Sequence, residues 1–244
     1  RILVANDDGL HGPGLRPLIA VMRRFADVTA VVPGQERSAD SHSLTLHKPI
    51  RVHRVATGLF ALNGKPADCA RLGILEIMKG QVDLVVSGIN RGYNLGEDIV
   101  YSGTVAAARE ATLLDIPAIA FSQDPSSRSY LVGAAFAAKL AKLVLRRKLP
   151  QGICLNVNIP ESIKGRVKPA RVTRLGKRLY SKEVTLRQDP RGGAYYWLAG
   201  STVTSIHEPG TDVEAVDQGH ISVTPLHIDV SDQPMMARLK KWSL

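Results

Sequence analysis

Two adjacent carboxylates, Asp7 and Asp8, follow the apolar run of residues 2–5 near the start of the chain. A short apolar run that ends at a turn signal is typical of a buried parallel strand, which would bring both carboxylates to one edge of a sheet. Paired carboxylates repel each other unless a cation is present, and Mg²⁺ and Mn²⁺ prefer oxygen ligands. Neighbouring strand residues point to opposite faces, so both reach one ion only if the chain bends, as Gly9 allows. The pair therefore indicates a divalent-metal site, with acidic helix-capping residues as the alternative.

Two neutral oxygen donors follow other predicted strands. Ser38 lies after a strand predicted at residues 28–32, and Asn90 follows one predicted at residues 82–86. Because ligands of open parallel sheets bind beyond the carboxyl ends of the strands, we expect these loops to meet at the edge that carries the carboxylates. Serine and asparagine oxygens would complete the shell of a hard cation without adding negative charge.

Ser102, Gly103 and Thr104 precede a segment of good helix formers, residues 105–114. Free backbone N–H groups at a helix N-terminus bind anions, and a glycine there allows close approach. The alternative is a plain Ser or Thr cap of the helix. A metal and a phosphate site at one sheet edge make a phosphoryl-transfer centre. We therefore expect substitutions of Ser102 or Thr104 to raise KM more than they weaken metal binding.

The pattern of apolar residues indicates a Rossmann-like α/β fold, with a mostly parallel sheet and helices on both faces. Strands are predicted at residues 2–5, 28–32, 82–86, 118–121 and 153–158, and the last of these is expected to be the final core strand. Helices are predicted at residues 15–25, 67–78, 105–114 and 130–145. Residues 50–55 and 59–62 are expected to form antiparallel strands that interrupt the parallel pattern.

The chain changes character after Pro160. Residues 161–191 contain ten Lys or Arg against three acidic residues, in a chain of net charge +10. Strand-like pieces are predicted at residues 171–175, 195–198 and 220–224, and a final helix at residues 234–242. We expect a single domain over residues 1–244, in which an α/β core (1–160) is followed by a basic, β-rich extension (161–244). Since residues 161–191 hold few large apolar side chains, we expect this segment to form an arm that packs on a second subunit.

Composition excludes several classes of protein. The two cysteines are far apart, which argues against structural zinc and for a reducing, cytoplasmic location. No apolar run reaches the ~18 residues of a membrane span. The basic stretch has little aromatic interleaving, so nucleic acid is not expected as a specific partner.

Several motifs resemble the SurE survival-protein family, in order along nearly the whole chain. They are Asn6-Asp7-Asp8-Gly9, Arg37-Ser38 through Ser43-Leu44-Thr45, Ser87-Gly88-Ile89-Asn90-Arg91-Gly92-Tyr93-Asn94-Leu95-Gly96, Tyr101-Ser102-Gly103-Thr104-Val105-Ala106-Ala107, Gln188-Asp189-Pro190-Arg191-Gly192 and Ser222-Val223-Thr224-Pro225-Leu226. The run from Ser87 to Ala107 is the most specific. The sequence departs from the family pattern at Ala39-Asp40 and at Lys65, where threonine is usual.

The resemblance implies a 5′/3′-nucleotidase that converts nucleoside monophosphates, and short polyphosphate in some members, with one divalent ion (Mg²⁺ or Mn²⁺) per subunit. It also implies homodimers or homotetramers that exchange C-terminal arms. The implied metal ligands are Asp7, Asp8, Ser38 and Asn90. The implied phosphate contacts are Asn94 and the turn formed by Ser102, Gly103 and Thr104.

We expect in-line attack on phosphorus by a metal-activated water, with Asp7 and Asp8 as the catalytic pair. Three other interpretations remain. A phosphatase that forms an aspartyl-phosphate usually has Asp-x-Asp and not adjacent aspartates. A receiver-like signalling domain needs a lysine at the end of a late strand, where this chain has only Asn156 and Asn158. An RNA-binding module would use the basic stretch.

Overall fold

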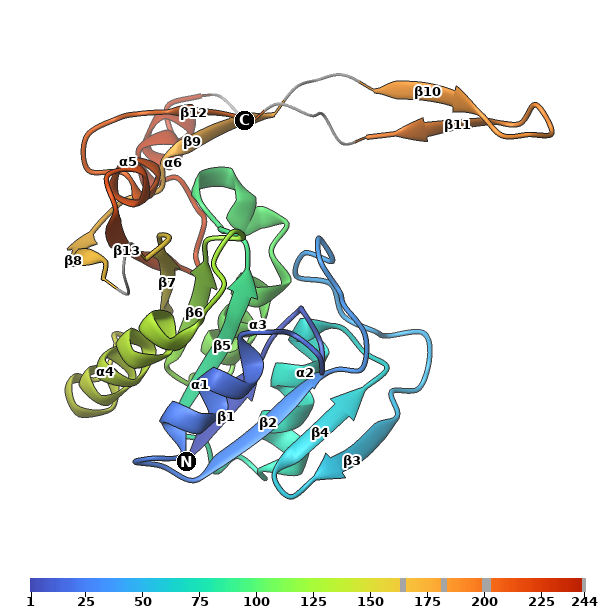
Figure 1. Cartoon of the computed structure of the whole chain (residues 1–244). Helices are drawn as coiled ribbons and strands as arrows, with labels where there is room; N and C mark the ends of the chain where they lie inside the picture. The colour runs from blue at the N-terminus through green and yellow to red at the C-terminus, as the bar shows by residue number, and fades with distance from the viewer. Residues whose placement is uncertain (163–165, 181–183, 199–202, 243–244) are drawn as a thin grey trace.

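The computed structural model describes residues 1–162, 166–180, 184–198 and 203–242. At its centre is a nine-stranded sheet with the order β3-β4-β2-β1-β5-β6-β7-β13-β8 (Figure 1). In chain order its strands are β1 (Ile2–Ala5), β2 (Val28–Pro33), β3 (Val52–Ala56), β4 (Leu59–Leu62), β5 (Leu84–Arg91), β6 (Ala118–Gln123), β7 (Ile153–Ile159), β8 (Lys168–Val172) and β13 (His220–His227). The six strands from β4 to β7 in this order are parallel, which confirms the predicted α/β class.

β1 lies in the middle of the parallel part of the sheet. It pairs with β2 on one side and β5 on the other, and all four of its residues are fully buried. A strand enclosed by neighbours and by helices on both faces has no polar face, which explains the uninterrupted Ile-Leu-Val-Ala run. Asp7 and Asp8 therefore emerge at the centre of the sheet's carboxyl edge.

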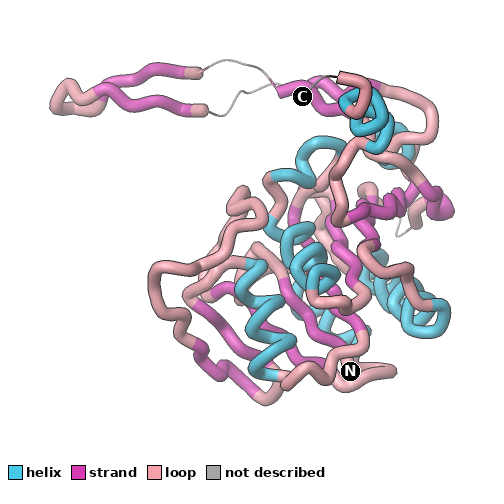
Figure 2. Tube along the Cα trace, turned by 180° about the vertical axis from the view of Figure 1, so that it is seen from behind, coloured by secondary structure: helices cyan, strands magenta, loops and turns pink. Residues whose placement is uncertain are grey.

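Two layers of helices enclose the sheet (Figures 1 and 2). α1 (Leu15–Met22) and α4 (Leu131–Arg147) pack in one apolar cluster with β1 side chains of one face, and α2 (Pro66–Leu72) and α3 (Gly103–Leu113) pack with those of the other. Alternate residues of β1 separate into these clusters, as the period of a strand requires.

The helix predicted at residues 67–78 is present, but its second half is not a regular α-helix. α2 ends at Leu72 and continues as a π-helical turn, η1 (Gly73–Ile77). A Cβ on Gly73 would lie 2.7 Å from Cδ2 of Leu3, so the glycine allows this turn to pack directly on β1. Glycine also has a low helix propensity, which lets the regular helix give way there.

β5 extends five residues beyond the predicted end at residue 86, to Arg91. Its pairing with β6 is irregular between Ser87 and Asn90, where Gly88 has a φ of +127°. A Cβ at this glycine would lie 2.3 Å from the Phe121 carbonyl oxygen, so only glycine fits. The irregularity ends the buried run and places Asn90 at the sheet edge.

The prediction that residues 153–158 form the final core strand is wrong. β13 pairs antiparallel with β7, and β8 pairs parallel with β13, so the sheet continues into the C-terminal part of the chain. Ile221 and Leu226 of β13 are buried in the same apolar clusters as the strands before it. The alternation of strand and helix that guided the prediction does not apply to a strand added antiparallel at the end of a parallel sheet.

The rest of the C-terminal part contains short elements. They are β9 (Lys177–Tyr180), which pairs with β12 (Val203–Ile206), the hairpin of β10 (Thr185–Gln188) and β11 (Ala194–Trp197), α5 (Asp212–Asp217) and α6 (Gln233–Leu239). Figure 1 shows the β10–β11 hairpin well away from the sheet, and every residue of its strands is exposed. None of the helices in the described ranges is long and apolar enough to cross a membrane.

Candidate active site

Asp7 faces the N-terminus of α3. Its carboxylate is 4% exposed, and its Oδ1 accepts a hydrogen bond from the Thr104 hydroxyl. A Cβ on Gly103 would lie 2.8 Å from the Asp7 Cβ, so glycine is needed for α3 to start against this side chain. The turn predicted to bind phosphate thus contacts a predicted metal ligand directly.

Asp8 faces the side of the sheet that carries α1. Its Oδ2 accepts a hydrogen bond from the backbone N–H of Arg91 at 3.1 Å. A Cβ on Gly12 would lie 2.6 Å from the Asp8 Cβ, so that glycine makes room for the carboxylate. β1 ends at Ala5, and Asp7 and Asp8 lie in the bend that follows it, so the strand rule of opposite faces no longer applies to them. The charge of Asp8 acts on Asp7, so the two carboxylates lie near each other.

Burial makes both carboxylates unfavourable as anions. It raises the pKa of Asp7 to about 6; the Thr104 hydrogen bond opposes this rise and the Asp8 charge adds to it. Burial also raises the pKa of Asp8, the Arg91 N–H opposes the rise, and the Glu36 charge adds to it. A bound cation would favour the ionised forms, so this pair suits a divalent ion.

Ser38 shares a hollow with Asp8. Both line one hollow of about 370 Å³, together with His11 and Arg91. The Ser38 hydroxyl donates to Glu36 at 2.8 Å, which leaves its oxygen lone pairs directed elsewhere. The backbone N–H of Arg37 donates to the Asp7 carbonyl at 2.8 Å and so fixes this loop to the end of β1.

Asn90 is held at the end of β5, next to the residue that binds Asp8. Its side-chain N–H donates to the Gly92 carbonyl at 3.0 Å, and this orientation leaves the amide oxygen as the available group. Within the described ranges, no three His, Cys, Asp or Glu side chains gather closely enough to hold a metal. A cation here would therefore need neutral oxygens such as those of Ser38 and Asn90, and the donor set fits a hard cation.

The turn before α3 has features of both predicted roles, the helix cap and the anion-binding site. The Ser102 hydroxyl caps the helix by accepting from the Val105 N–H at 3.1 Å, so the capping interpretation holds for this side chain. Thr104 is fully buried, and its hydroxyl is directed to Asp7. Among the described residues nothing accepts a hydrogen bond from the Gly103 N–H, which is the group in this turn best placed to bind an anion.

Asn94 is clamped by side chains of β6 and β7. Its backbone N–H donates to Asn158 Oδ1 at 2.8 Å, and its carbonyl accepts from the amides of Asn156 (2.8 Å) and Asn158 (3.0 Å). Its own side-chain amide donates to the Ser122 hydroxyl at 2.7 Å. These four bonds fix the loop between β5 and the 3₁₀ helix η2 (Gly96–Val100), which leads to Ser102.

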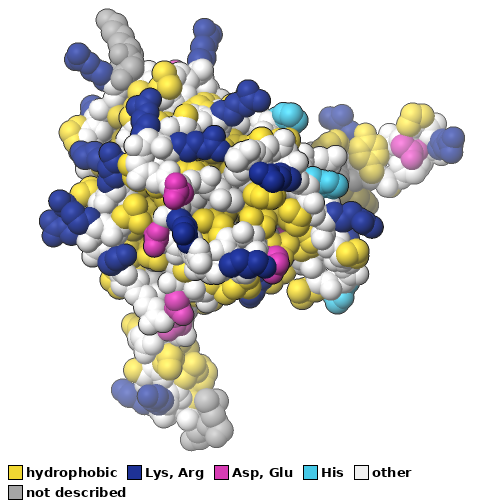
Figure 3. Space-filling view, turned by 90° about the horizontal axis from the view of Figure 1, so that it is seen from below, with side chains coloured by type: hydrophobic (Ala, Val, Ile, Leu, Met, Phe, Trp, Pro, Cys, Tyr) yellow, Lys and Arg dark blue, Asp and Glu magenta, His cyan; other side chains and the backbone are white. Residues whose placement is uncertain are grey.

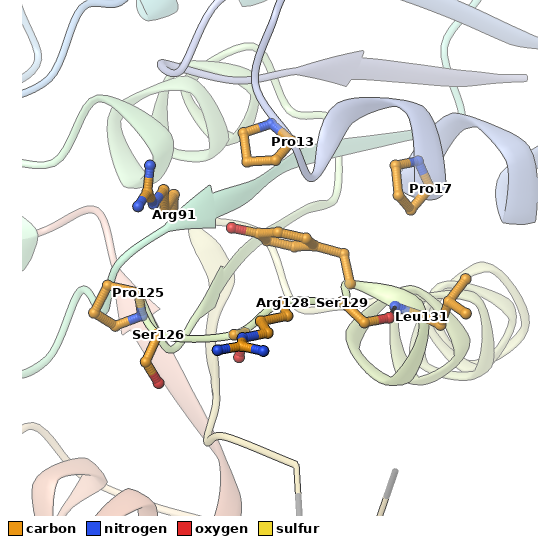
Figure 4. A pocket seen from close by; sticks show the side chains of 10 residues that line it. Pro13, Pro17, Arg91, Pro125, Ser126, Arg128, Ser129 and Leu131 are labelled. Carbon is orange, nitrogen blue, oxygen red and sulfur yellow. Dashed lines mark hydrogen bonds between the residues drawn. The ribbon is translucent and has the colours of Figure 1, made fainter.

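A second hollow, of about 510 Å³, is drawn in Figure 4. It lies between the start of α1, with Pro13 and Pro17, and the loop that contains Pro125, Ser126 and Arg128. Pro13 and Arg91 line both hollows, so the space at Asp8 continues outward past Arg91.

Sequence reasoning missed three features of this site. The roles of Asn156 and Asn158 were not foreseen, although two buried asparagines in an otherwise apolar strand are a signal, because buried amides need partners. The contact of Thr104 with Asp7 joins residues 97 positions apart, which no local pattern reports. His42 binds the buried Glu110 of α3 at 2.8 Å, and so ties the loop of Ser38 to that helix.

The fold and site define an α/β protein of the open, doubly wound type, with paired carboxylates and a helix N-terminus at the carboxyl edge of its sheet. Residues 2–182 match the family described as Survival protein SurE. The chain belongs to this family, which confirms the resemblance seen in the sequence.

Individual relatives resemble the chain over its whole length. The "5′-nucleotidase SurE" of Geobacter sulfurreducens is 47% identical, over 100% of this chain and 94% of its own length. The protein of the same name from Geotalea daltonii is 45% identical, over 100% and 99%. A solved structure, the SurE protein from Aquifex aeolicus, is 38% identical with a TM-score of 0.86 and covers 98% of both chains.

Proposed function

We propose that this protein is a nucleotidase, a phosphoric monoester hydrolase that releases phosphate from nucleoside 5′- or 3′-monophosphates and from short polyphosphate. The observation that carries the proposal is the contact between Asp7 and the turn of Thr104, because it joins a carboxylate pair to an anion-binding helix N-terminus. The names of the Geobacter and Geotalea relatives support the same activity.

We propose Asp7, Asp8, Ser38 and Asn90 as ligands of one divalent cation, Mg²⁺ or Mn²⁺. The raised pKa values of the two carboxylates, the shared hollow of Asp8 and Ser38, and the orientation of the Asn90 amide support this set. A divalent cation held there supplies positive charge that acidifies water and stabilises phosphoryl oxygens.

The chain's own groups would bind and orient the phosphate monoester for in-line attack by water. The Gly103 N–H and the N-terminal end of α3 would bind phosphoryl oxygens, and the Thr104 hydroxyl would hold Asp7 in one orientation. Asn94 would contact the phosphate from the clamped loop. Asp7 and Asp8, as carboxylates, would accept a proton from the attacking water or orient it.

Lys and Arg side chains would attract the anionic substrate. Figure 3 shows that Lys and Arg outnumber Asp and Glu even on the face seen from below, which lies at the amino edge of the sheet and not at the proposed site. With a net charge of +10, such a surface should raise the association rate of nucleotides in a salt-dependent way.

We propose that the chain forms homodimers or homotetramers through its C-terminal arm, while residues 1–244 act as one domain. The β10–β11 hairpin supports the arm, because Tyr196 and Trp197 of β11 are 63% and 57% exposed, and in the described part of the chain no layer covers the hairpin. We also propose a cytoplasmic location, which the two free, buried cysteines Cys69 and Cys154 support.

The test is hydrolysis of a panel of 5′- and 3′-nucleoside monophosphates with Mg²⁺, Mn²⁺ or a chelator. We expect phosphate release with a divalent ion and its loss with the chelator. Failure to hydrolyse any nucleotide with either ion would contradict the proposal, and retention of activity in the chelator would contradict the metal set.

A further inference from the structure

Lys65 occupies the N-cap position of a helix that its side chain does not cap. It is the N-cap residue of α2, with extended backbone dihedrals (φ −97°, ψ 168°). An N-cap side chain normally accepts a hydrogen bond from the first turn of the helix, but an ammonium group has only donors. A positive charge at a helix N-terminus is also unfavourable with respect to the helix dipole. The capping that α2 does have comes from Asp68, whose Oδ2 accepts from the Lys65 N–H at 2.8 Å.

The Lys65 ammonium is half-buried without a counter-ion. It donates to the Ser43 hydroxyl at 2.7 Å, and in the part of the chain that the structure describes, no carboxylate oxygen lies within 4.0 Å of it. Asp68, on the same helix, is engaged by the backbone N–H groups of Thr45 and Lys65. A charge that is half removed from water and unpaired is unfavourable, so this position suits a site that receives an anion.

The surroundings of Lys65 are the borders of the active site. Pro66 Cγ would lie 2.8 Å from a Cβ placed on Gly103, so the start of α2 packs on the turn before α3. Ser43 belongs to the loop that carries Ser38, and this loop is bound to the segment before the turn, because the Ser41 hydroxyl donates to the Val100 carbonyl at 2.7 Å.

We propose that the Lys65 ammonium is a further substrate-binding group, which contacts the phosphoryl oxygens of a phosphate monoester dianion held at the Gly103–Thr104 turn. The side chain reaches the phosphate by exchanging its bond to the Ser43 hydroxyl for one to the substrate. This proposal rests on the proposed phosphatase function of the same site. The positive charge of Lys65 would stabilise the bound dianion from the α2 side of the turn.

Two substitutions separate substrate binding from a structural role. Lys65→Thr removes the charge and supplies a hydroxyl that can cap α2, so we expect a Tm higher by roughly 2–4 °C. At the same time the KM for nucleoside monophosphates and the dissociation constant of inorganic phosphate should rise about tenfold, because a charge-assisted hydrogen bond is lost. Lys65→Met keeps the length without a cap, and should weaken binding equally without the gain in Tm.

The matched control is Lys139→Met, which removes an exposed ammonium of α4 and should change neither affinity nor Tm. Binding of inorganic phosphate, measured by calorimetry with Mn²⁺ present, tests Lys65 apart from turnover. If the wild type binds phosphate through Lys65 but hydrolyses no nucleotide, the proposed function fails and the Lys65 assignment stands. If both Lys65 variants bind phosphate and nucleotide as the wild type does, whatever their Tm, the assignment of Lys65 is overturned.

Discussion

Replacing Thr104 by valine tests the link between the helix N-terminus and the carboxylate pair. The side chain is fully buried, and its hydroxyl donates to Oδ1 of Asp7. Valine has nearly the same shape, so packing on α3 should survive while the hydrogen bond is lost. The sequence alone led us to expect that a substitution at Thr104 would raise KM more than it weakens metal binding. Because the hydroxyl is directed to a proposed metal ligand, we predict instead that Thr104→Val weakens metal binding more than it raises KM.

The expected size of the effect follows from the charge of the acceptor. A hydrogen bond to a charged group contributes about 1.5–3 kcal/mol, and losing it corresponds to an increase of about 10–100-fold in the metal dissociation constant. Loss of a group that orients a metal ligand typically costs a factor of the same size. Because backbone N–H donors at Gly103 remain, the KM at saturating metal should change much less.

Calorimetric titration with Mn²⁺ measures this directly, and a thermal melt checks the fold. Thr112→Val is a matched control, since Thr112 is also a buried threonine of α3, but its hydroxyl donates to the Ala108 carbonyl at 2.9 Å. Equal metal affinity in wild type, Thr104→Val and Thr112→Val would refute the reasoning. An equal loss in both variants would show that the effect comes from α3 in general and not from Asp7.

Three further predictions concern the proposed metal ligands, the hydrogen bonds that hold Asn94, and the C-terminal arm. Asp8→Asn should lower kcat at least ~10²-fold with the fold intact; near-normal turnover at saturating Mn²⁺ would count against it. Asn158→Leu should raise KM about tenfold with unchanged metal affinity, since the Asn94 backbone loses two hydrogen bonds. Thr224→Val should not, because the buried Thr224 hydroxyl of β13 bonds to Thr173 and not to Asn94; steady-state kinetics compares the two variants. Replacing Tyr196 and Trp197 by serine should lower the mass measured by light scattering with little change in Tm, and an unchanged mass would rule out the hairpin as the arm.

The sequence predicted the centre of the molecule well. β1 is recognisable because a strand enclosed on all sides must be apolar throughout, and its abrupt end at Asp7 identifies the sheet edge. Ser38 and Asn90 were placed at this edge for the same topological reason, and the structure puts Ser38 in the hollow of Asp8. These inferences depend only on the local pattern and on the rule that parallel strands share a carboxyl edge.

In the C-terminal part the sequence located several elements but not how they pair. The strands predicted at residues 195–198 and 220–224 and the helix predicted at residues 234–242 correspond to β11, β13 and α6. The strands β9, β10 and β12 were missed, and the place of β13 in the sheet depends on distant partners. β13 carries a proline and a threonine, and only its pairing with β7 over residues 222–227 shows that it belongs to the sheet. β9, β10 and β12 have four residues each, and residues 181–183, between β9 and β10, lie outside the described ranges. Such short strands follow from tertiary contacts more than from propensity.

The C-terminal part nevertheless helps to shape the active site. Asp98 of η2 accepts hydrogen bonds from Arg178 and Tyr180 of β9, and its backbone carbonyl accepts from the Ser102 N–H at 3.1 Å. At the other end of η2, the Gly96 N–H donates to Asp212 of α5 at 3.0 Å. Both ends of the segment that leads into the phosphate turn are therefore held by residues beyond position 170. Because β9 lies close in sequence to the hairpin proposed as the arm, packing of that arm on a second subunit would act on the same strand that holds Asp98. Assembly and phosphate binding would then share one structural support, which gives a physical reason for the basic extension to be part of the enzyme and not an appendage.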